Sequence, residues 1–274
     1  MNGIDGSVIW HHDSIQSHQG NVAPLLVDCN GDGVMDVVTG ANGTPYTTAT
    51  AGWKMAHYGD YHIALDGRDG NTLWYSATGA GIHPSPFLFQ NEKGEDLICG
   101  LDAYGEFQIL NLKGEFQLKV GFGFDHYMSP VVYKNTLILG DYIVDISEQY
   151  YNWSKDSSYR YLHKDAPEHR SEIIGRVSAT TMVADVLDLG SQQFISVSES
   201  GNMIIRSDKG KILKNISFPK GAEASVMIKD IDGDGLLELL IASLDGYLYC
   251  YDTKSKGEAN YGQFRWNNKN IPLK

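Results

Sequence analysis

Two nine-residue stretches carry oxygen-bearing side chains at the spacing that a hard cation requires. Residues 28–36 read D-x-N-x-D-G-x-x-D, and residues 230–238 read D-x-D-x-D-G-x-x-E. Oxygen ligands at the first, third, fifth and ninth positions suit Ca²⁺, and the glycine permits the tight turn between them. Carboxylates this close repel one another without a cation, although an acidic hairpin turn that holds no ion is the alternative. The predicted calcium ligands are Asp28, Asn30, Asp32, Asp36, Asp230, Asp232, Asp234 and Glu238.

A second group of residues could carry out acid–base chemistry on a sugar acid. In β-elimination from a uronic acid, an arginine neutralises the carboxylate so that the neighbouring C5 proton becomes acidic. A neutral histidine or tyrosine removes that proton, and a second such group protonates the leaving oxygen. Glycoside hydrolysis usually needs two carboxylates, and the sequence contains no G-x-S-x-G, P-loop or H-E-x-x-H motif. The candidates for these steps are His62, His83, Tyr159 and Arg176.

Aromatic and basic residues near these positions could bind the sugar chain. Tryptophan can stack on a sugar ring, and arginine can pair with an acidic group. Each such residue also has a structural alternative, because loop histidines are often solvated and tyrosines often pack between sheets. The predicted binding residues are Trp53, His126, Tyr127, Trp153 and Arg160. Other candidates for the tyrosine and arginine roles are Tyr150, Tyr151, Tyr161, Arg160 and Arg170.

The elements that would position these residues recur along the chain. Five segments align on an apolar strand followed by a turn: NVAPLLVD, HPSPFLFQ, YMSPVVYK, SATTMVAD and EASVMIKD. A second and a third apolar run follow each of them, and the clearest copies add a fourth, as in DGRDGNTLWYSA. Four short strands recurring about every 45 to 50 residues are typical of a β-propeller blade. The sequence therefore predicts an all-β fold, a β-propeller of four-stranded blades in a single domain over residues 1–274.

Two copies of the repeat are longer than this period. The excess falls in residues 43–60 and 147–176, which are rich in Tyr, Trp, His and Arg and predict functional insertions. The first residues, NGIDGSVIWHH, look like the outer half of an incomplete blade. They either complete the last of five visible blades or belong to a larger ring, such as one of seven blades. In the repeat's register, His62, His83 and the end of the second insertion lie at one rim.

Several motifs resemble known propeller repeats. DCNGDGVMD, DIDGDGLLE and LDGRDGNTLW are similar to the FG-GAP/VCBS and PQQ-like repeats, over nearly the whole chain. This resemblance implies calcium ions with a structural role. The histidines, tyrosine and arginine resemble the site of propeller polysaccharide lyases, above all the ulvan lyases, in which two histidines flank a blade boundary. The resemblance implies catalytic roles for His62, His83, Tyr159 and Arg176, in a chain shorter than those lyases.

The composition limits the partners of the protein. The 274 residues carry a formal net charge of −12, with 34 acidic against 22 basic residues. This balance argues against nucleic-acid binding, and no apolar run is long enough to span a membrane. It also opposes a polyanionic partner unless the site is locally basic. The second insertion could supply such a patch through Arg160, Lys164, His169, Arg170 and Arg176.

We therefore predict a calcium-stabilised lyase that cleaves an anionic, uronic-acid-containing polysaccharide, ulvan or a similar glycan, by β-elimination. The alternative is a non-catalytic, calcium-dependent propeller that binds carbohydrate or protein, as adhesion modules do. A quinone-dependent dehydrogenase, which the PQQ-like repeat suggests, ranks third because it needs a larger propeller. We expect a monomer that is secreted, periplasmic or at the cell surface, because cytosolic calcium is too dilute for weak sites.

Overall fold

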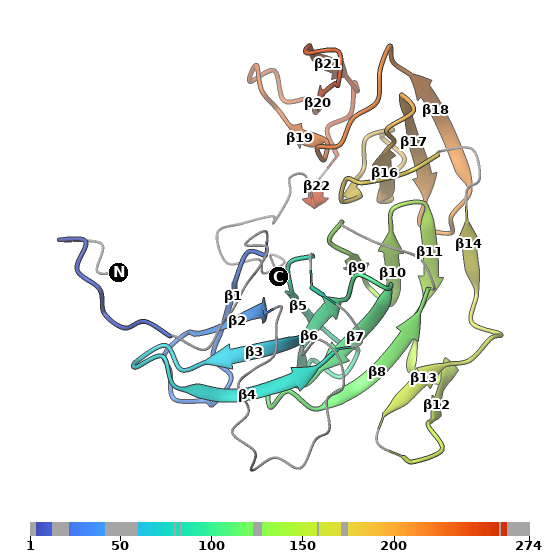
Figure 1. Cartoon of the computed structure of the whole chain (residues 1–274). Helices are drawn as coiled ribbons and strands as arrows, with labels where there is room; N and C mark the ends of the chain where they lie inside the picture. The colour runs from blue at the N-terminus through green and yellow to red at the C-terminus, as the bar shows by residue number, and fades with distance from the viewer. Residues whose placement is uncertain are drawn as a thin grey trace. The chain divides into compact units, whose positions relative to one another are not determined.

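The computed structural model describes residues 4–12, 22–41, 60–78, 81–82, 84–122, 128–157, 159–170, 175–257 and 259–261. Apart from one 3₁₀ turn, η1 (Glu148–Tyr150), the regular elements in these ranges are strands, grouped into five sheets (Figure 1). We call these sheets blades 1 to 5. No helix in the described ranges is long and apolar enough to cross a membrane. The all-β prediction is confirmed.

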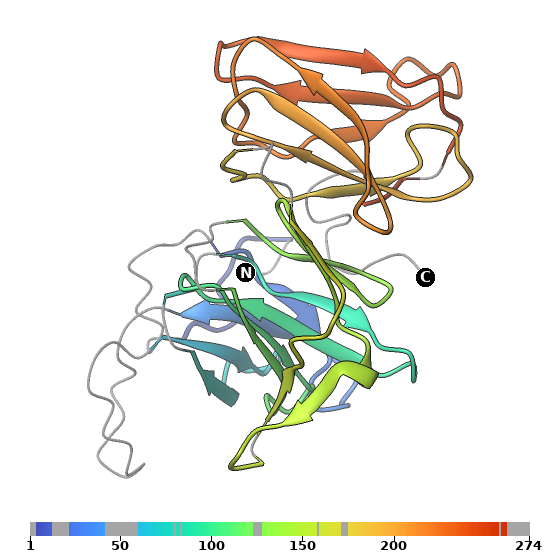
Figure 2. The same cartoon turned by 90° about the vertical axis from the view of Figure 1, so that its right-hand side faces the viewer.

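Blades 1 and 2 come from the N-terminal part of the chain. Blade 1 consists of β1 (Leu25–Val27), β2 (Asp36–Ala41), β3 (Tyr61–Leu65) and β4 (Thr72–Ala77). Blade 2 begins with β5 (Phe87–Gln90), β6 (Asp96–Leu101), β7 (Glu106–Leu110) and β8 (Phe116–Gly121). It is extended by a hairpin of β12 (Tyr151–Trp153) and β13 (Arg160–Leu162). The hairpin joins the sheet because β13 pairs in parallel with β8 (Figure 2).

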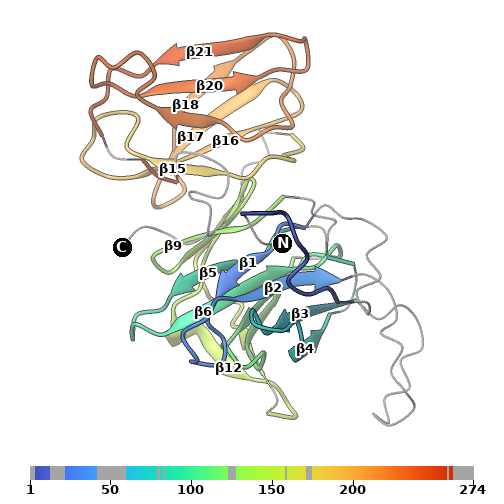
Figure 3. The ribbon, with the colours of Figure 1, turned by 90° about the vertical axis from the view of Figure 1, so that its left-hand side faces the viewer.

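Blades 3, 4 and 5 follow in chain order. Blade 3 consists of β9 (Val131–Tyr133), β10 (Thr136–Leu139), β11 (Tyr142–Asp145) and β14 (Glu168–Arg170). Blade 4 consists of β15 (Met182–Ala184), β16 (Gln193–Val197), β17 (Asn202–Ser207), β18 (Ile212–Ser217) and β22 (Ala259–Tyr261), which pairs with β15. Blade 5 contains β19 (Met227–Lys229), β20 (Glu238–Ala242) and β21 (Leu248–Asp252). Within the described ranges, β21 is an edge strand that pairs with β20 alone (Figure 3).

The chain divides into two compact units. Unit 1 comprises residues 1–127 and 151–162, and unit 2 comprises residues 128–150 and 163–274. Unit 1 therefore contains blades 1 and 2 with the β12–β13 hairpin, and unit 2 contains blades 3, 4 and 5. The single domain expected over residues 1–274 stays a prediction.

The predicted strands lie where the repeat places them. The five aligned segments contain β1, β5, β9, β15 and β19, and the two runs that follow each segment form the next two strands. The second insertion, however, is not one long loop, because it supplies η1, the β12–β13 hairpin and β14. Of the first insertion, only Asp60 lies within the described residues.

Two tryptophans dock on hairpin turns in the same way. Trp74 on β4 donates its indole N–H to the carbonyl oxygen of Leu112 (2.8 Å), in the β7–β8 turn. Trp10 likewise donates to a carbonyl of the β3–β4 turn (2.9 Å) and packs on Gly70. At Gly114, φ is +78° and a Cβ would lie 2.5 Å from the Trp74 ring, so both the turn and the ring contact require glycine. Trp10 thus packs as an outer-strand tryptophan, although residues 4–12 form no strand.

Blades 3 and 4 of unit 2 are joined by a buried arginine. Arg206 on β17 is 1% exposed and donates from Nη2 to the carbonyl oxygen of Gly140 (2.7 Å). It also donates to the carbonyl oxygen of Asp141 (2.6 Å) and to the hydroxyl of Ser196 (3.0 Å). Because both carbonyls belong to the β10–β11 turn, the guanidinium connects blade 4 to blade 3.

Replacing Arg206 with methionine should lower the free energy of unfolding by about 3 kcal/mol, because buried carbonyl groups lose their donors. Urea denaturation followed by circular dichroism measures this change. Lys214→Met, at an exposed position on β18, is the matched control and should change stability by less than about 0.5 kcal/mol. An Arg206→Met protein as stable as the control variant would contradict the assigned role.

Candidate functional site

His62 is buried within blade 1. It lies on β3, between Gly40 of β2 and Ser76 of β4, and its exposed fraction is 0%. Neither ring nitrogen has a hydrogen-bond partner in the described structure. Every residue of β3 is buried, so this strand lacks the solvent-facing side that an open rim would give it.

The imidazole fits because the facing strand of blade 2 carries glycine. A Cβ on Gly100 of β6 would lie 2.1 Å from Nε2 of His62. Gln108 pairs with Gly100 on the adjacent strand β7, is fully buried, and has an Oε1 atom without a partner. Residues directly opposite one another in antiparallel strands project to the same face. Gln108 therefore lies on the face of blade 2 that meets His62, and its Oε1 and both ring nitrogens of His62 are buried without a hydrogen-bond partner among the described residues.

Burial keeps His62 neutral and away from substrate. Desolvation lowers the pKa of its imidazole to about 4, so the ring is uncharged at neutral pH. A neutral imidazole suits a general base, but a base must reach within hydrogen-bonding distance of the proton it removes. A side chain with no exposed surface offers a polymer no such approach. The geometry therefore does not support His62 as the base, and its catalytic role stays a prediction from the sequence.

Two other predicted catalytic residues, Tyr159 and Arg176, lie within the described residues. Arg176 belongs to unit 2, whereas His62 and Tyr159 belong to unit 1. The guanidinium of Arg176 is exposed, and its Nε lies 3.3 Å from Oε1 of Glu199, which also accepts a hydrogen bond from Ser178. This cation is thus already paired with a carboxylate. Four further predicted residues lie outside the described residues: Trp53, His83, His126 and Tyr127.

The β12–β13 hairpin presents an arginine next to two aromatic rings. Trp153 and Arg160 are opposite one another in the hairpin, so their side chains share a face. The Arg160 guanidinium lies 4.7 Å from the Tyr151 ring centre and 5.9 Å from that of Trp153. Its Nε donates to the carbonyl oxygen of Gln117 on β8 (3.0 Å), which fixes the plane of the guanidinium. Trp153 is 65% exposed, so the ring next to this cation faces solvent.

A second cation lies on β8 beside the same hairpin. Lys119 Nζ is 4.0 Å from the Phe116 ring centre and 5.3 Å from that of Tyr159. It also forms an ion pair with Glu106 of β7 (3.0 Å), and the Gln108 amide donates to the same carboxylate (2.7 Å). Lys119 is therefore held in place and largely neutralised, whereas the terminal amino groups of Arg160 have no hydrogen-bond partner among the described residues.

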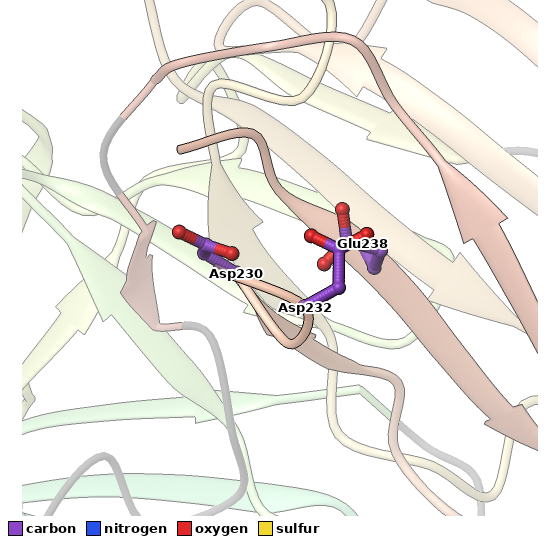
Figure 4. A group of neighbouring side chains, drawn as sticks. All are labelled: Asp230, Asp232 and Glu238. Atoms are coloured by element: carbon purple, nitrogen blue, oxygen red, sulfur yellow. The ribbon is translucent and has the colours of Figure 1, made fainter. Parts of the chain in front are cut away.

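The acidic loop at residues 230–238 gathers carboxylates. Asp230, Asp232 and Glu238 each offer an oxygen, and these oxygens all lie within 4.8 Å of one another (Figure 4). Within the described ranges this is the single group of three or more metal-ligating side chains that meet so closely. Backbone N–H groups of Gly233 and Gly235 donate to Asp230 (2.7 and 3.0 Å), which holds the loop in its tight turn. Such an oxygen cluster suits Ca²⁺.

The acidic loop at residues 28–36 has the same backbone pattern but a different neighbour. Asp28 accepts hydrogen bonds from the N–H groups of Gly31 (2.7 Å) and Gly33 (2.9 Å), as Asp230 does in the other loop. Beside it, in the β3–β4 turn, Arg68 forms an ion pair with Asp32 (3.2 Å). The two loops are therefore alike in shape and different in charge.

Comparisons with solved structures show the class of fold. The chain is similar to BamB from Moraxella catarrhalis, with a TM-score of 0.53 and 14% identity over 93% of this chain and 64% of that one. BBS1N in complex with ARL6DN gives a TM-score of 0.49 and 9% identity, over 85% of this chain and 65% of that one. This chain thus spans less than two thirds of the length of either. No family model and no curated protein matches the sequence.

The protein is a β-propeller by fold, as the repeat predicted. Identity this low shows the fold alone and says nothing of activity.

The sequence did not predict roles for Lys119 and Arg68. Lys119 lies beside the aromatic hairpin, and Arg68 lies beside the acidic loop at residues 28–36. Lys119 pairs with Glu106, 13 positions away, and lies over the Tyr159 ring, 40 positions away. Arg68 contacts Asp32, which is 36 positions away. Only the register of paired strands and turns could have revealed them.

The stability of unit 1 should depend on pH through His62. Its pKa falls from 6.5 to about 4 on folding, so protons bind more tightly to the unfolded chain in this window. The free energy of unfolding is therefore highest above about pH 6.5, where His62 is neutral in both states. It falls by about 3 kcal/mol as pH drops toward 4. His62→Leu should remove this part of the dependence, measured by urea denaturation from pH 4 to pH 7.

His163→Gln provides the control, because this half-exposed histidine pairs with Asp165 (3.1 Å) and is not enclosed. It should keep the dependence that His62→Leu loses. Equal pH dependence in the His62→Leu variant and the unmodified protein would show that the imidazole is not buried as described.

Proposed function

We propose that the protein binds an anionic polysaccharide at the aromatic hairpin of blade 2. The observation that carries this proposal is the Arg160 guanidinium, which lies near the Tyr151 and Trp153 rings and whose terminal amino groups have no hydrogen-bond partner among the described residues. An exposed indole offers a sugar ring an apolar face, and a guanidinium offers two parallel N–H donors to a carboxylate or sulfate. The two groups are adjacent, as one acidic sugar residue requires.

The surroundings of Arg160 favour an acidic rather than a neutral glycan. Its Nε bond to β8 and its contact with the Tyr151 ring orient the guanidinium before any ligand binds. A preorganised donor loses less side-chain entropy when it binds an oxyanion. Although the net charge of −12 repels polyanions at long range, Arg160 adds a local cation whose terminal amino groups have no hydrogen-bond partner among the described residues.

Binding without cleavage agrees better with the described residues than the lyase predicted from the sequence. A lyase needs a base near the neutralising cation, and the described histidine expected in that role is enclosed between blades. A binding propeller needs the aromatic hairpin alone. We also propose that the chain belongs to the FG-GAP/VCBS or PQQ-like repeat families. We further propose that it is secreted to a calcium-rich compartment.

Calcium at the 230–238 loop completes the proposed function as a structural ion. Asp230, Asp232 and Glu238 would hold it, since their oxygens all lie within 4.8 Å of one another and pair with no cationic side chain of the described residues. The ion would neutralise the repulsion among these carboxylates and fasten the β19–β20 hairpin. It would support the fold of blade 5 and take no part in glycan chemistry.

Trp153→Ala and Arg160→Lys should each weaken binding to a uronate-containing polysaccharide about tenfold, because one loses the stacking ring and the other the planar donor. Affinity electrophoresis in gels containing ulvan measures the change, with a neutral glucan for comparison. Tyr104→Ala removes an equally exposed ring from another turn of blade 2 and should leave migration unchanged. Equal retardation of all three variants would exclude this surface.

Incubation of the protein with ulvan and calcium should produce no rise in the ultraviolet absorbance of unsaturated uronyl groups, while the protein still binds the polymer. Such a rise would establish the lyase instead. If the absorbance does rise, His62→Leu tests the role of this histidine. The rise would disappear in the variant if His62 is catalytic and would remain if His62 is a buried structural residue.

A further inference from the structure

In the acidic loop at residues 28–36, a side chain of the protein itself, Arg68, supplies a positive charge. Arg68, in the β3–β4 turn, places Nη1 3.2 Å from Oδ2 of Asp32, and its Nη2 donates to the backbone carbonyl oxygen of Asp32 (3.1 Å). The guanidinium therefore engages a carboxylate and a carbonyl of the loop together. These are the two kinds of oxygen that calcium takes from loops of this type.

The carboxylate at the ninth position of this loop, Asp36, is also bound by groups of the protein. Asp36 is fully buried, and its Oδ2 accepts the N–H of Cys29 (2.8 Å) at the start of the loop. Its Oδ1 accepts the N–H of Gly67 (2.9 Å), the residue next to Arg68. Both oxygens are thus bound to backbone donors, and one of them ties the loop to the turn that carries the arginine.

Asn30 adds a third connection between loop and turn. Its side-chain amide donates to Asp66 (3.3 Å), and Asp66 in turn accepts the backbone N–H of Arg68 (2.8 Å). Three of the four positions that would have held an ion therefore contact the β3–β4 turn. Asp28, the fourth, is satisfied by N–H groups of its own loop.

The loop at residues 230–238 differs at these same positions. Its ninth residue is the longer Glu238, which accepts the N–H of Ile231 through Oε2 (2.7 Å) and still brings an oxygen near Asp230 and Asp232. No arginine or lysine among the described residues pairs with its carboxylates. Asp28, Asp32 and Asp36 form no cluster of comparable closeness.

We infer that the loop at residues 28–36 takes no calcium, because the Arg68 guanidinium fills the role of the ion. The motif spacing alone predicted calcium in both loops, and this inference restricts it to residues 230–238. It concerns the fold of blade 1 and does not rest on the glycan proposal. Arg68 links the β1–β2 and β3–β4 turns, which a calcium ion held by the first loop alone would not do.

The test begins from a variant whose second loop cannot bind an ion, Asp230→Asn with Asp232→Asn. Isothermal titration of this double variant with CaCl₂ should give no binding heat, and calcium should leave its Tm unchanged. Calcium binding by the folded double variant would overturn the inference. This measurement leaves Arg68 and its contacts intact, so it does not depend on whether an Arg68 variant folds.

Arg68→Met is then added to the same background. Without calcium, this variant should have a lower Tm, because the carboxylates of the first loop lose their counter-charge. Calcium at about 100 times its Kd should then raise the Tm by at least about 4 °C, with one site appearing in the titration. A folded Arg68→Met variant that gains no site would show that the arginine is not what keeps calcium out.

Lys113→Met in the same background is the matched control. Lys113 occupies the β7–β8 turn of blade 2, the counterpart of the turn that carries Arg68, and it faces no acidic loop of this pattern. Its replacement should create no calcium site. A calcium-dependent Tm in this control would mean that loss of any turn cation produces the effect, which would overturn a specific role for Arg68.

Discussion

Close packing of neighbouring sheet faces is the constraint on which unit 1 depends. A Cβ on Gly40 of β2 would lie 2.5 Å from the Ile82 side chain, and a Cβ on Gly100 of β6 would lie 2.1 Å from His62. Atoms cannot approach so closely, so both strands need glycine at these points despite its cost in chain entropy. The same approach leaves both ring nitrogens of His62 and Oε1 of Gln108 buried without hydrogen-bond partners among the described residues, so this contact contains polar atoms as well as being tight.

Strand placement was predictable because it depends on local pattern. The runs that became β1, β2 and β3 are apolar, short and bounded by turn residues, and their later copies behave alike. The burial of His62 was not predictable, since a strand buried on both faces gives no alternation from which to assign one face to solvent. The parallel pairing of β13 with β8 was equally hidden, because it joins segments about 40 residues apart.

In the candidate sites, too, the features that depend on local sequence were predictable and those that depend on neighbouring strands were not. Spacing within a loop is a local signal, so the acidic loops at residues 28–36 and 230–238 could be found from the sequence. Whether an ion is needed depends on what lies beside the loop, and Arg68 comes from another hairpin. Trp153 and Arg160 were expected to bind substrate from their residue types. Their adjacency came from hairpin pairing, and the support from Gln117 came from β8.

The unpaired edge of β21 bears on how the protein behaves in solution. In the described part of blade 5 its outer backbone groups meet no strand, and Tyr247 and Leu248 are 69% and 66% exposed. A strand edge of this kind accepts any extended segment that can complete its hydrogen bonds. The long-range repulsion of a strongly acidic chain opposes association through this edge, and added salt weakens that repulsion.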